Sequence, residues 1–206
     1  MNDEITITCT SIDCPERTGG KCTATADPNL MVDLFLEESN KIENVRDEKS
    51  HKQARRAWDY LASQDKLDGG VILKVHKLLM LNQPILGYQR GYWRREQVGV
   101  YKNGILLREA PQWRLVPELV AQWLQAVSAC VAFSHSKQYH EVEVNRNEIL
   151  DARIRNDHIG YEKIHPFIDG NGRTGRMFMN WTRLKVGLPL LVIFEDDKQE
   201  YYKWFI

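Results

Sequence analysis

The sequence predicts a mainly α-helical domain, a helical bundle that carries one β-hairpin. Several segments repeat apolar residues every three to four positions, which is the period of an amphipathic helix. One short segment alternates instead and leads into Asn103-Gly104, a dipeptide that favours a tight hairpin turn. The chain has 206 residues, 43% of them hydrophobic, which suffices for one domain with a substantial core.

The N-terminal residues 1–26 differ in composition from the rest of the chain. Thr, Ser, Gly and Cys dominate there, and we expect a flexible tail, although Ile5-Thr6-Ile7-Thr8 has the pattern of a short strand. Asp27 and Pro28 then predict a helix start, because Asp caps free N–H groups and Pro suits the first helical position. The domain is therefore expected to cover 27–206 and to open with a helix over about 29–44.

Apolar spacing predicts the remaining elements in order along the chain. Helices are expected within the charged stretch 46–68 and over 71–81, 118–133 and 148–162, then from Thr174 onward and near 199–202. The hairpin is expected between the second and third of these, with one strand over 97–102 and its return over 105–107.

Charge and hydropathy limit the classes of partner. Lys and Arg number 28, as do Asp and Glu, so the zero net charge predicts no strong attraction to nucleic acid or acidic membranes. We find no apolar run of transmembrane length and no signal peptide, since the N-terminus is polar and acidic. The expected compartment is the cytoplasm.

The cysteines allow two interpretations. Cys9, Cys14 and Cys22 would offer three zinc ligands, but their spacing matches no usual zinc pair and no histidine is near. Reduced thiols in a flexible tail are the favoured interpretation. Cys130 is predicted to be a small buried core residue, and His76 a partly buried, hydrogen-bonded histidine rather than a ligand.

The stretch from His165 to Arg176 carries the chemistry. Gly170 and Gly172 allow a sharp turn whose N–H groups can approach an anion. The helical pattern that begins at Thr174 puts a helix N-terminus directly after this loop, where free N–H groups and the helix dipole favour phosphate. This arrangement suits a nucleoside triphosphate and its metal ion.

Four charged or titratable side chains in that stretch have expected roles. Arg173 and Arg176 share a helical face and lean toward the helix N-terminus, where phosphate would lie. Asp169 is a natural ligand for a magnesium ion that also holds phosphate oxygens. His165 can act as a general base near neutral pH.

These residues resemble the motif HPFx(D/E)GNGRxxR of the Fic-domain family at every fixed position. Met179-Asn180, Leu184 and Gly187-Leu188-Pro189 are also similar to the segment that follows the motif in that family. The resemblance implies a Fic-type helical bundle whose hairpin is called the flap. It also implies transfer of AMP from ATP, with Mg²⁺, to a Ser, Thr or Tyr hydroxyl of a target protein.

The resemblance assigns a role to each motif residue. His165 would take the proton of the target hydroxyl, and Asp169 would bind Mg²⁺. The phosphates would be held by five residues, with the Asn side chain adding a donor near the α-phosphate: Gly170, Asn171, Gly172, Arg173 and Arg176. The family's kinase-like branch, the Doc toxins, has lysine in place of the second motif glycine, so Gly172 speaks against phosphorylation.

Upstream, Ser39, Glu43 and Asn44 resemble the family's inhibitory motif (S/T)xxxE(G/N). The implied role is a pairing of Glu43 with Arg176 that denies this arginine to the γ-phosphate. An intact Glu43 also leaves open the reverse activity, in which the glutamate positions water for de-AMPylation. A less favoured alternative is an ATP-sensing binding module without catalysis.

Two further sites follow from the resemblance alone. The flap, Gln97-Val98-Gly99-Val100-Tyr101, would pair its backbone edge with the target segment. Tyr201 and Tyr202 would line the nucleotide-base pocket, or they are aromatic core residues; both interpretations stay open. The expected partners are ATP and a target protein, another copy of this chain included; homo-oligomerisation is left open.

Overall fold

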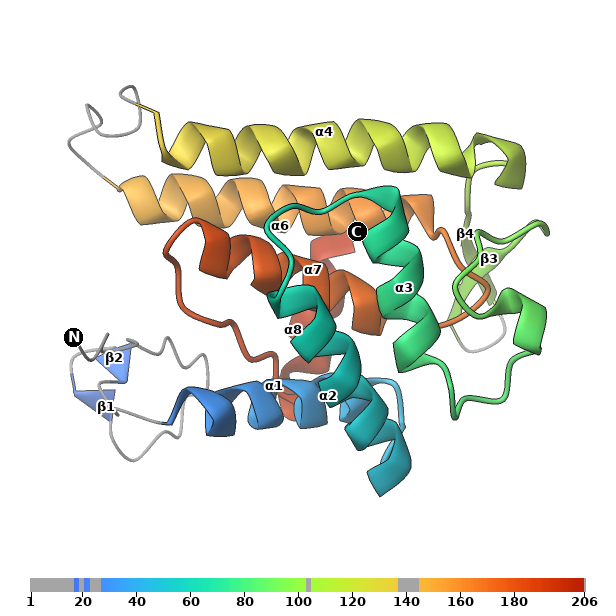
Figure 1. The fold of residues 1–206 in the computed structure, drawn as a ribbon, viewed down its shortest axis with the longest axis horizontal. Coiled ribbons are helices and arrows are strands. Elements are labelled where there is room, and N and C mark those ends of the chain that lie inside the picture. Colours follow the sequence, from blue (N-terminus) through green and yellow to red (C-terminus); the bar gives the residue numbers. More distant parts are fainter. Residues whose placement is uncertain (1–16, 19–20, 23–26, 103–104, 137–144, 206) are drawn as a thin grey trace.

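Helix α7 (Asn171–Lys185) lies at the centre, and the other long helices pack around it (Figure 1). Twelve of its 15 residues are buried, so it is covered on nearly every side. The computed structural model describes residues 17–18, 21–22, 27–102, 105–136 and 145–205. Within them, the predicted mainly α-helical bundle is confirmed.

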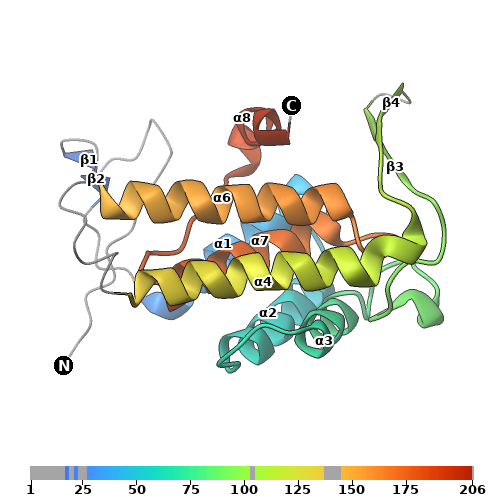
Figure 2. The ribbon, with the colours of Figure 1, turned by 90° about the horizontal axis from the view of Figure 1, so that it is seen from above.

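The helices cover different sides of α7. Helices α4 (Val116–Ser134) and α6 (Arg146–Ile164) lie side by side along one side, and α1 (Pro28–Ile42), α2 (Glu48–Ala62) and α3 (Gly69–Leu79) cover others (Figures 1 and 2). Helix α8 (Lys198–Tyr202) follows near the C-terminus. Short 3-10 helices cover Gly87–Gln89, Trp113–Leu115, Glu195–Asp197 and Lys203–Phe205.

Helix α1 begins as predicted and ends earlier. The Asp27 carboxylate accepts a hydrogen bond from the Asn29 N–H (2.9 Å), and Pro28 is the first helical residue. The helix ends at Ile42 rather than Asn44, because Asn44 has a left-handed φ of 58° that a helix cannot continue. Glu43 is therefore the C-cap residue and points out of the helix end.

Helix α3 is displaced by two residues toward the N-terminus relative to the prediction. Asp68 caps it by accepting from the Val71 N–H (2.9 Å), so Gly69 and Gly70 belong to its first turn instead of breaking the pattern. Helix α7 likewise begins at Asn171, three residues before the predicted Thr174. In both cases a cap or a left-handed glycine starts the helix before the apolar period becomes visible.

The hairpin consists of antiparallel strands β3 (Gly99–Lys102) and β4 (Ile105–Glu109), with an irregular register between Val100 and Tyr101. Its predicted turn, Asn103-Gly104, lies outside the described residues. A second, very short antiparallel pair that the sequence did not predict joins β1 (Arg17–Thr18) and β2 (Lys21–Cys22). The rest of 1–26, with Cys9, Cys14 and the expected strand at Ile5–Thr8, lies outside the described residues.

Residues Trp113–Ser134 are long and apolar enough, by length and composition, to cross a membrane. The expectation that no such run exists is therefore wrong. One face of this segment is buried against the bundle, through Val116, Val120, Trp123, Val127 and Cys130. The prediction of Cys130 as a buried core residue is confirmed.

Candidate nucleotide site

His165 follows the last residue of α6 and adopts a left-handed conformation (φ 51°) that turns the chain sharply. Two arginines bind the carbonyls at this helix end. Arg94 donates from Nε to the His165 carbonyl (2.8 Å), and Arg108 of β4 donates to the carbonyls of Glu162 (3.1 Å) and Lys163 (2.8 Å). Terminal helix carbonyls have no partner within the helix, so these guanidinium groups satisfy them and hold His165 in place.

The His165 ring is neutral, as a proton acceptor must be. Burial lowers its pKa to about 4, and the nearby charges of Arg108 and Arg94 contribute to the lowering. The imidazole is therefore neutral at pH 7. Its Nδ1 is buried without a hydrogen-bond partner among the described residues. A neutral ring has one nitrogen free to take a proton, which general-base catalysis requires.

Phe167 anchors the motif loop to the hydrophobic core, where its side chain is fully buried. Its ring stacks on His76 (centroids 3.7 Å apart) and lies 5.2 Å from the ring of Trp93. His76 accepts a hydrogen bond at Nδ1 from the Gly91 N–H (2.9 Å), so its Nε2–H donates to the Asp169 carbonyl (3.0 Å). Burial lowers the His76 pKa to about 4, which keeps this neutral bridge intact.

His76 and Arg94 thus hold the motif loop from outside the motif, and the sequence did not identify them as part of the site. His76 was expected to be hydrogen-bonded, and it is, although it is fully rather than partly buried. No local pattern at either residue signals these contacts, because their partners lie 93 and 71 residues away.

Gly170 and Asn171 close the loop onto the start of α7. Gly170 has a φ of 78°, and a Cβ there would lie 2.6 Å from the Met80 sulfur, so both conformation and space require glycine. The Asn171 amide bonds the Phe167 N–H and carbonyl at 2.9 and 3.0 Å. The amide oxygen and one of the two amide N–H groups therefore brace the loop, and donation near the α-phosphate stays a prediction for the other N–H.

Arg173 offers unused donors at the N-terminus of α7. Its guanidinium is buried, and Nε and Nη1 have no hydrogen-bond partner among the described residues. Nη2 lies 3.4 Å from the Met80 sulfur and 4.0 Å from an Asp169 carboxylate oxygen. Orphaned charged donors beside the free N–H groups of a helix start are what an anionic ligand would satisfy.

Asp169 fits a magnesium ion shared with phosphate. Its side chain is 52% exposed, and one oxygen accepts the Gly170 N–H at 2.6 Å. No cluster of three or more His, Cys, Asp or Glu is found among the described residues. A single carboxylate is still a suitable donor set, since Mg²⁺ commonly uses one or two carboxylates together with substrate phosphates.

Arg176, in contrast, is fully engaged. It donates to the Ser39 hydroxyl and carbonyl (2.9 Å each), to Glu43 Oε1 (2.8 Å) and to the Tyr201 hydroxyl (3.3 Å). It is buried, so a carboxylate partner offsets much of the cost of a charge removed from water. The expected pairing of Glu43 with Arg176 is present in this structure.

Glu43 reaches over the N-terminus of α7. A Cβ on Gly172 would collide with Glu43 Oε1, so the carboxylate lies directly against the first turn of the helix. The left-handed φ of Asn44 makes this approach possible by ending α1, and such a φ favours Asn or Gly. The glutamate carboxylate therefore lies where an anion attracted by the helix start would lie.

Tyr201 does not line an open pocket. The residue is 3% exposed, and its hydroxyl accepts from Arg176 Nη1 (3.3 Å) and is hydrogen-bonded to His158 Nε2 (2.8 Å). Burial lowers the His158 pKa to about 3, so this ring is neutral at pH 7. The core interpretation therefore holds for Tyr201. Tyr202, 37% exposed, remains the candidate for a base pocket.

The flap is tied to the domain at its base. Gln97 donates to the Ala110 carbonyl (2.6 Å), the Ala110 N–H donates to Val98 (3.0 Å), and Gly99 pairs with Glu109. Strand β3 pairs only with β4 in the part of the chain that the structure describes, so its other edge is available. Docking of a target by Val100 and Tyr101 remains a prediction.

The sequence is similar to that of known proteins. The model of the Fic/DOC family matches residues 66–182. The "Protein adenylyltransferase Fic" of Drosophila persimilis is 30% identical over 134 residues, and that of Drosophila melanogaster 29%. These matches cover 63% of this chain and under a quarter of each relative.

Solved structures share the fold. A Fic domain containing signaling protein from Bacteroides thetaiotaomicron superposes with a TM-score of 0.66 at 16% identity, over 85% of this chain and 70% of that one. A Fic family protein from Desulfovibrio desulfuricans gives 0.61 at 23% identity, over 86% and 57%. At these identities the likeness concerns the fold.

Proposed function

Because this chain belongs to the Fic/DOC family, we propose that it is a Mg²⁺-dependent protein adenylyltransferase that transfers AMP from ATP to a Ser, Thr or Tyr hydroxyl of a target protein. We further propose that Glu43 inhibits it in the resting state. One observation carries the proposal: the motif that leads into the buried helix α7 combines a neutral His165 with an Arg173 whose Nε and Nη1 have no hydrogen-bond partner among the described residues.

The reaction would be a single displacement at the α-phosphorus. The target hydroxyl oxygen forms a bond to phosphorus, the bond from phosphorus to the β-phosphate bridging oxygen breaks, and pyrophosphate leaves. His165 takes the hydroxyl proton, for which its neutral ring is suited. Arg173 and the first N–H groups of α7 would hold the phosphates, and stabilise charge that develops during transfer.

Asp169 is the residue that would hold Mg²⁺, whose chemistry is to neutralise negative charge on the leaving pyrophosphate. Its half-exposed carboxylate and its position beside Arg173 support this role.

Inhibition would arise because the Glu43 carboxylate and a phosphate of ATP compete for the same hydrogen-bond donors. The carboxylate of Glu43 occupies Arg176 and lies against Gly172, and a phosphate needs both positions. Arginine binds carboxylate and phosphate through the same planar arrangement of N–H groups, so the two ligands exclude each other.

De-AMPylation is the second candidate, and one observation favours it. Glu43 uses Oε1 on Arg176, whereas Oε2 has no partner among the described residues and the side chain is 35% exposed. That oxygen could orient a water molecule for attack on the phosphorus of the AMP group. The bond from phosphorus to the target oxygen would then break, free AMP would leave with the water oxygen, and the target oxygen would take a proton to restore its hydroxyl.

The test is incorporation of label from α-labelled ATP with Mg²⁺ and host lysate. Glu43→Gly is expected to raise incorporation by roughly tenfold to a hundredfold, because a hydrogen bond to a charged group contributes about 1.5–3 kcal/mol. His165→Ala should lose incorporation by about a hundredfold or more while it still binds ATP.

Equal labelling by wild type and Glu43→Gly would contradict inhibition by Glu43, and undiminished labelling by His165→Ala would remove His165 as the base. Loss of label from a pre-modified target on addition of wild type would favour the hydrolase instead.

A further inference from the structure

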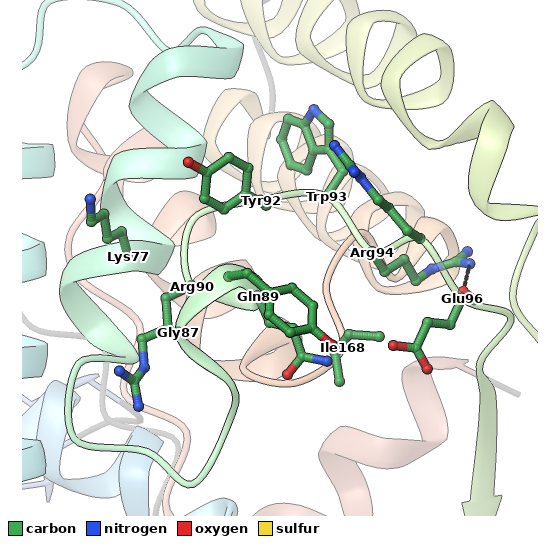
Figure 3. Close-up of a pocket in the computed structure, with 11 residues that line it drawn as sticks. Lys77, Gly87, Gln89, Arg90, Tyr92, Trp93, Arg94, Glu96 and Ile168 are labelled. Carbon is green, nitrogen blue, oxygen red and sulfur yellow. Dashed lines mark hydrogen bonds between the residues drawn. The ribbon is translucent and has the colours of Figure 1, made fainter.

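A hollow of about 480 Å³ opens beside the motif loop, on the side of the flap (Figure 3). It is bounded by α3, by the loop that follows α3 and by residues 92–96, and Ile168 of the motif contributes to it. Ile168 directly precedes Asp169, so the hollow adjoins the proposed catalytic loop. The nucleotide-site residues His165, Arg173 and Arg176 do not line it.

The hollow is positively charged although the chain as a whole is neutral. Four cationic side chains line it (Lys77, Arg90, Arg94 and Arg95), against one carboxylate, that of Glu96. Arg94 and Arg90 donate to backbone carbonyls, which carry no compensating charge. Lys77 and Arg95 are exposed and form no ion pair within the described residues. Positive charge is therefore in excess in this hollow.

The rim is aromatic. Tyr88 is 67% exposed and Tyr92 is 57% exposed, and Trp93 lies beside them. A smaller adjoining hollow of about 230 Å³ shares Tyr92 and Trp93 and adds Arg114, which lies 4.5 Å over the ring of Trp113. No carboxylate lines this second hollow. Exposed Tyr, Trp and Arg side chains are the residue types that contribute most to protein–protein binding.

The position of the surface relates it to the flap. Residues 94–96 lead directly into Gln97 and strand β3. A segment that pairs with the free edge of β3 would run past the start of that strand and over these hollows. His76, which bonds the Asp169 carbonyl, directly precedes Lys77 on α3, so the surface and the motif loop share a rigid support.

We propose that these two adjoining hollows form a docking surface for an acidic segment of the target protein that also presents an aromatic or apolar side chain. This proposal rests on the proposed function for the identity of its partner. Acidic side chains of the target meet Lys77 and Arg95, and the apolar side chain packs among Tyr88, Tyr92 and Trp93. The surface thereby selects targets by charge and presents their hydroxyl to the adjacent site.

The test measures binding without ATP, so it is independent of catalysis. The probe is a fluorescein-labelled peptide of alternating glutamate and phenylalanine, and the reference peptide has glutamine in place of every glutamate. Fluorescence anisotropy of wild type should show preference for the acidic peptide, weakening as salt increases. Lys77→Glu/Arg95→Glu should weaken its binding by about tenfold or more.

The matched control is Arg56→Glu/Lys66→Glu, which makes the same charge change at exposed positions outside both hollows. It should bind the acidic peptide nearly as wild type does. Equal binding of the two peptides, or equal loss in both double variants, would overturn the proposal.

Two more outcomes distinguish the alternatives. If wild type sediments as a dimer that only Lys77→Glu/Arg95→Glu dissociates, the surface joins two copies of the chain and the proposal is wrong. If the acidic peptide binds as expected but Glu43→Gly transfers no AMP to any protein, the docking surface stands and the proposed function fails.

Discussion

Arg176 is the residue on which the proposed inhibition and its release would depend. Its guanidinium is held from three sides, by Ser39, Glu43 and Tyr201, and only Glu43 carries a compensating charge. The neutral partners fix where the guanidinium lies, whereas in the proposed inhibition Glu43 would decide whether it is free for a phosphate. The tyrosine hydroxyl also links Arg176 to the neutral ring of His158.

Removal of that hydroxyl tests the link. Tyr201→Phe leaves Arg176 Nη1 and His158 Nε2 without their buried partner, so we expect a loss of about 1–3 kcal/mol in the free energy of unfolding. The measurement is urea denaturation. The matched control is Tyr202→Phe, whose side chain is partly exposed and which should stay within about 0.5 kcal/mol of wild type. Equal stabilities of the two variants would contradict the structural role of the Tyr201 hydroxyl.

Among the elements, the flap and helix α6 are coupled. Arg108 on β4 donates to two carbonyls in the last turn of α6, immediately before His165. In the proposed mechanism, the hairpin that would hold the target is thus bonded to the helix that leads to His165, the proposed base. A shift of one element relative to the other would misalign the target hydroxyl and the imidazole.

This coupling predicts the behaviour of Arg108→Met in a Glu43→Gly background. The rate of AMP transfer at saturating ATP should fall by about tenfold to a hundredfold, because small misplacements of reacting groups are costly. The ATP dissociation constant should not change, since Arg108 is bonded to the helix end and not to the start of α7. Arg108→Lys keeps the positive charge but lacks the two guanidinium nitrogens that bind two carbonyls at once. Its transfer rate should therefore lie between those of Arg108→Met and the unchanged Arg108. Weaker ATP binding at an unchanged transfer rate would show that Arg108 acts elsewhere.

At the scale of the whole molecule, the interior holds titratable groups of opposite pH dependence. Burial lowers the pKa values of His76, His158 and His165, so the unfolded chain binds more protons below about pH 6.5 and stability falls on acidification. Burial raises the pKa of Glu162 to about 8, and its Oε1 has no partner within the described residues. The folded state therefore keeps this proton at pH values where the unfolded chain has lost it.

The sign for Glu162 follows from that difference in bound protons. Between pH 4.5 and about 8 the folded state binds the extra proton, so stability from this group falls as pH rises. Glu162→Gln should gain stability relative to wild type with increasing pH, by about 1 kcal/mol per pH unit, and the gain should level off above about pH 8. Urea denaturation across this pH range measures the difference in free energy of unfolding between Glu162→Gln and wild type. The control is Glu109→Gln, a change at an exposed position whose difference from wild type should not vary with pH. A pH-independent difference for Glu162→Gln would mean that this carboxyl titrates normally in the folded protein.

Features that depend on neighbouring residues could be predicted from the sequence. The start of α1 at Asp27 and Pro28, the hairpin strands on either side of Asn103-Gly104, and the loop that runs into α7 all follow from a few adjacent residues. Helix ends were less predictable. Asp68 and Gly170 start α3 and α7 before the apolar repeat of each helix appears in the sequence. Asn44 ends α1 although the apolar repeat continues to this position.

What only the tertiary structure decided is which distant groups meet. The sequence by itself determined the family and the roles proposed for the motif, because His165, Asp169, Arg173 and Arg176 lie within twelve residues and those roles would depend on one loop and one helix turn. It did not reveal that Arg94 and Arg108 hold the end of α6, that His76 holds the motif loop, or that Tyr201 binds Arg176. These contacts join residues 25 to 93 positions apart. Periodicity and capping act over a few residues, whereas such partners are chosen by how the helices pack around α7.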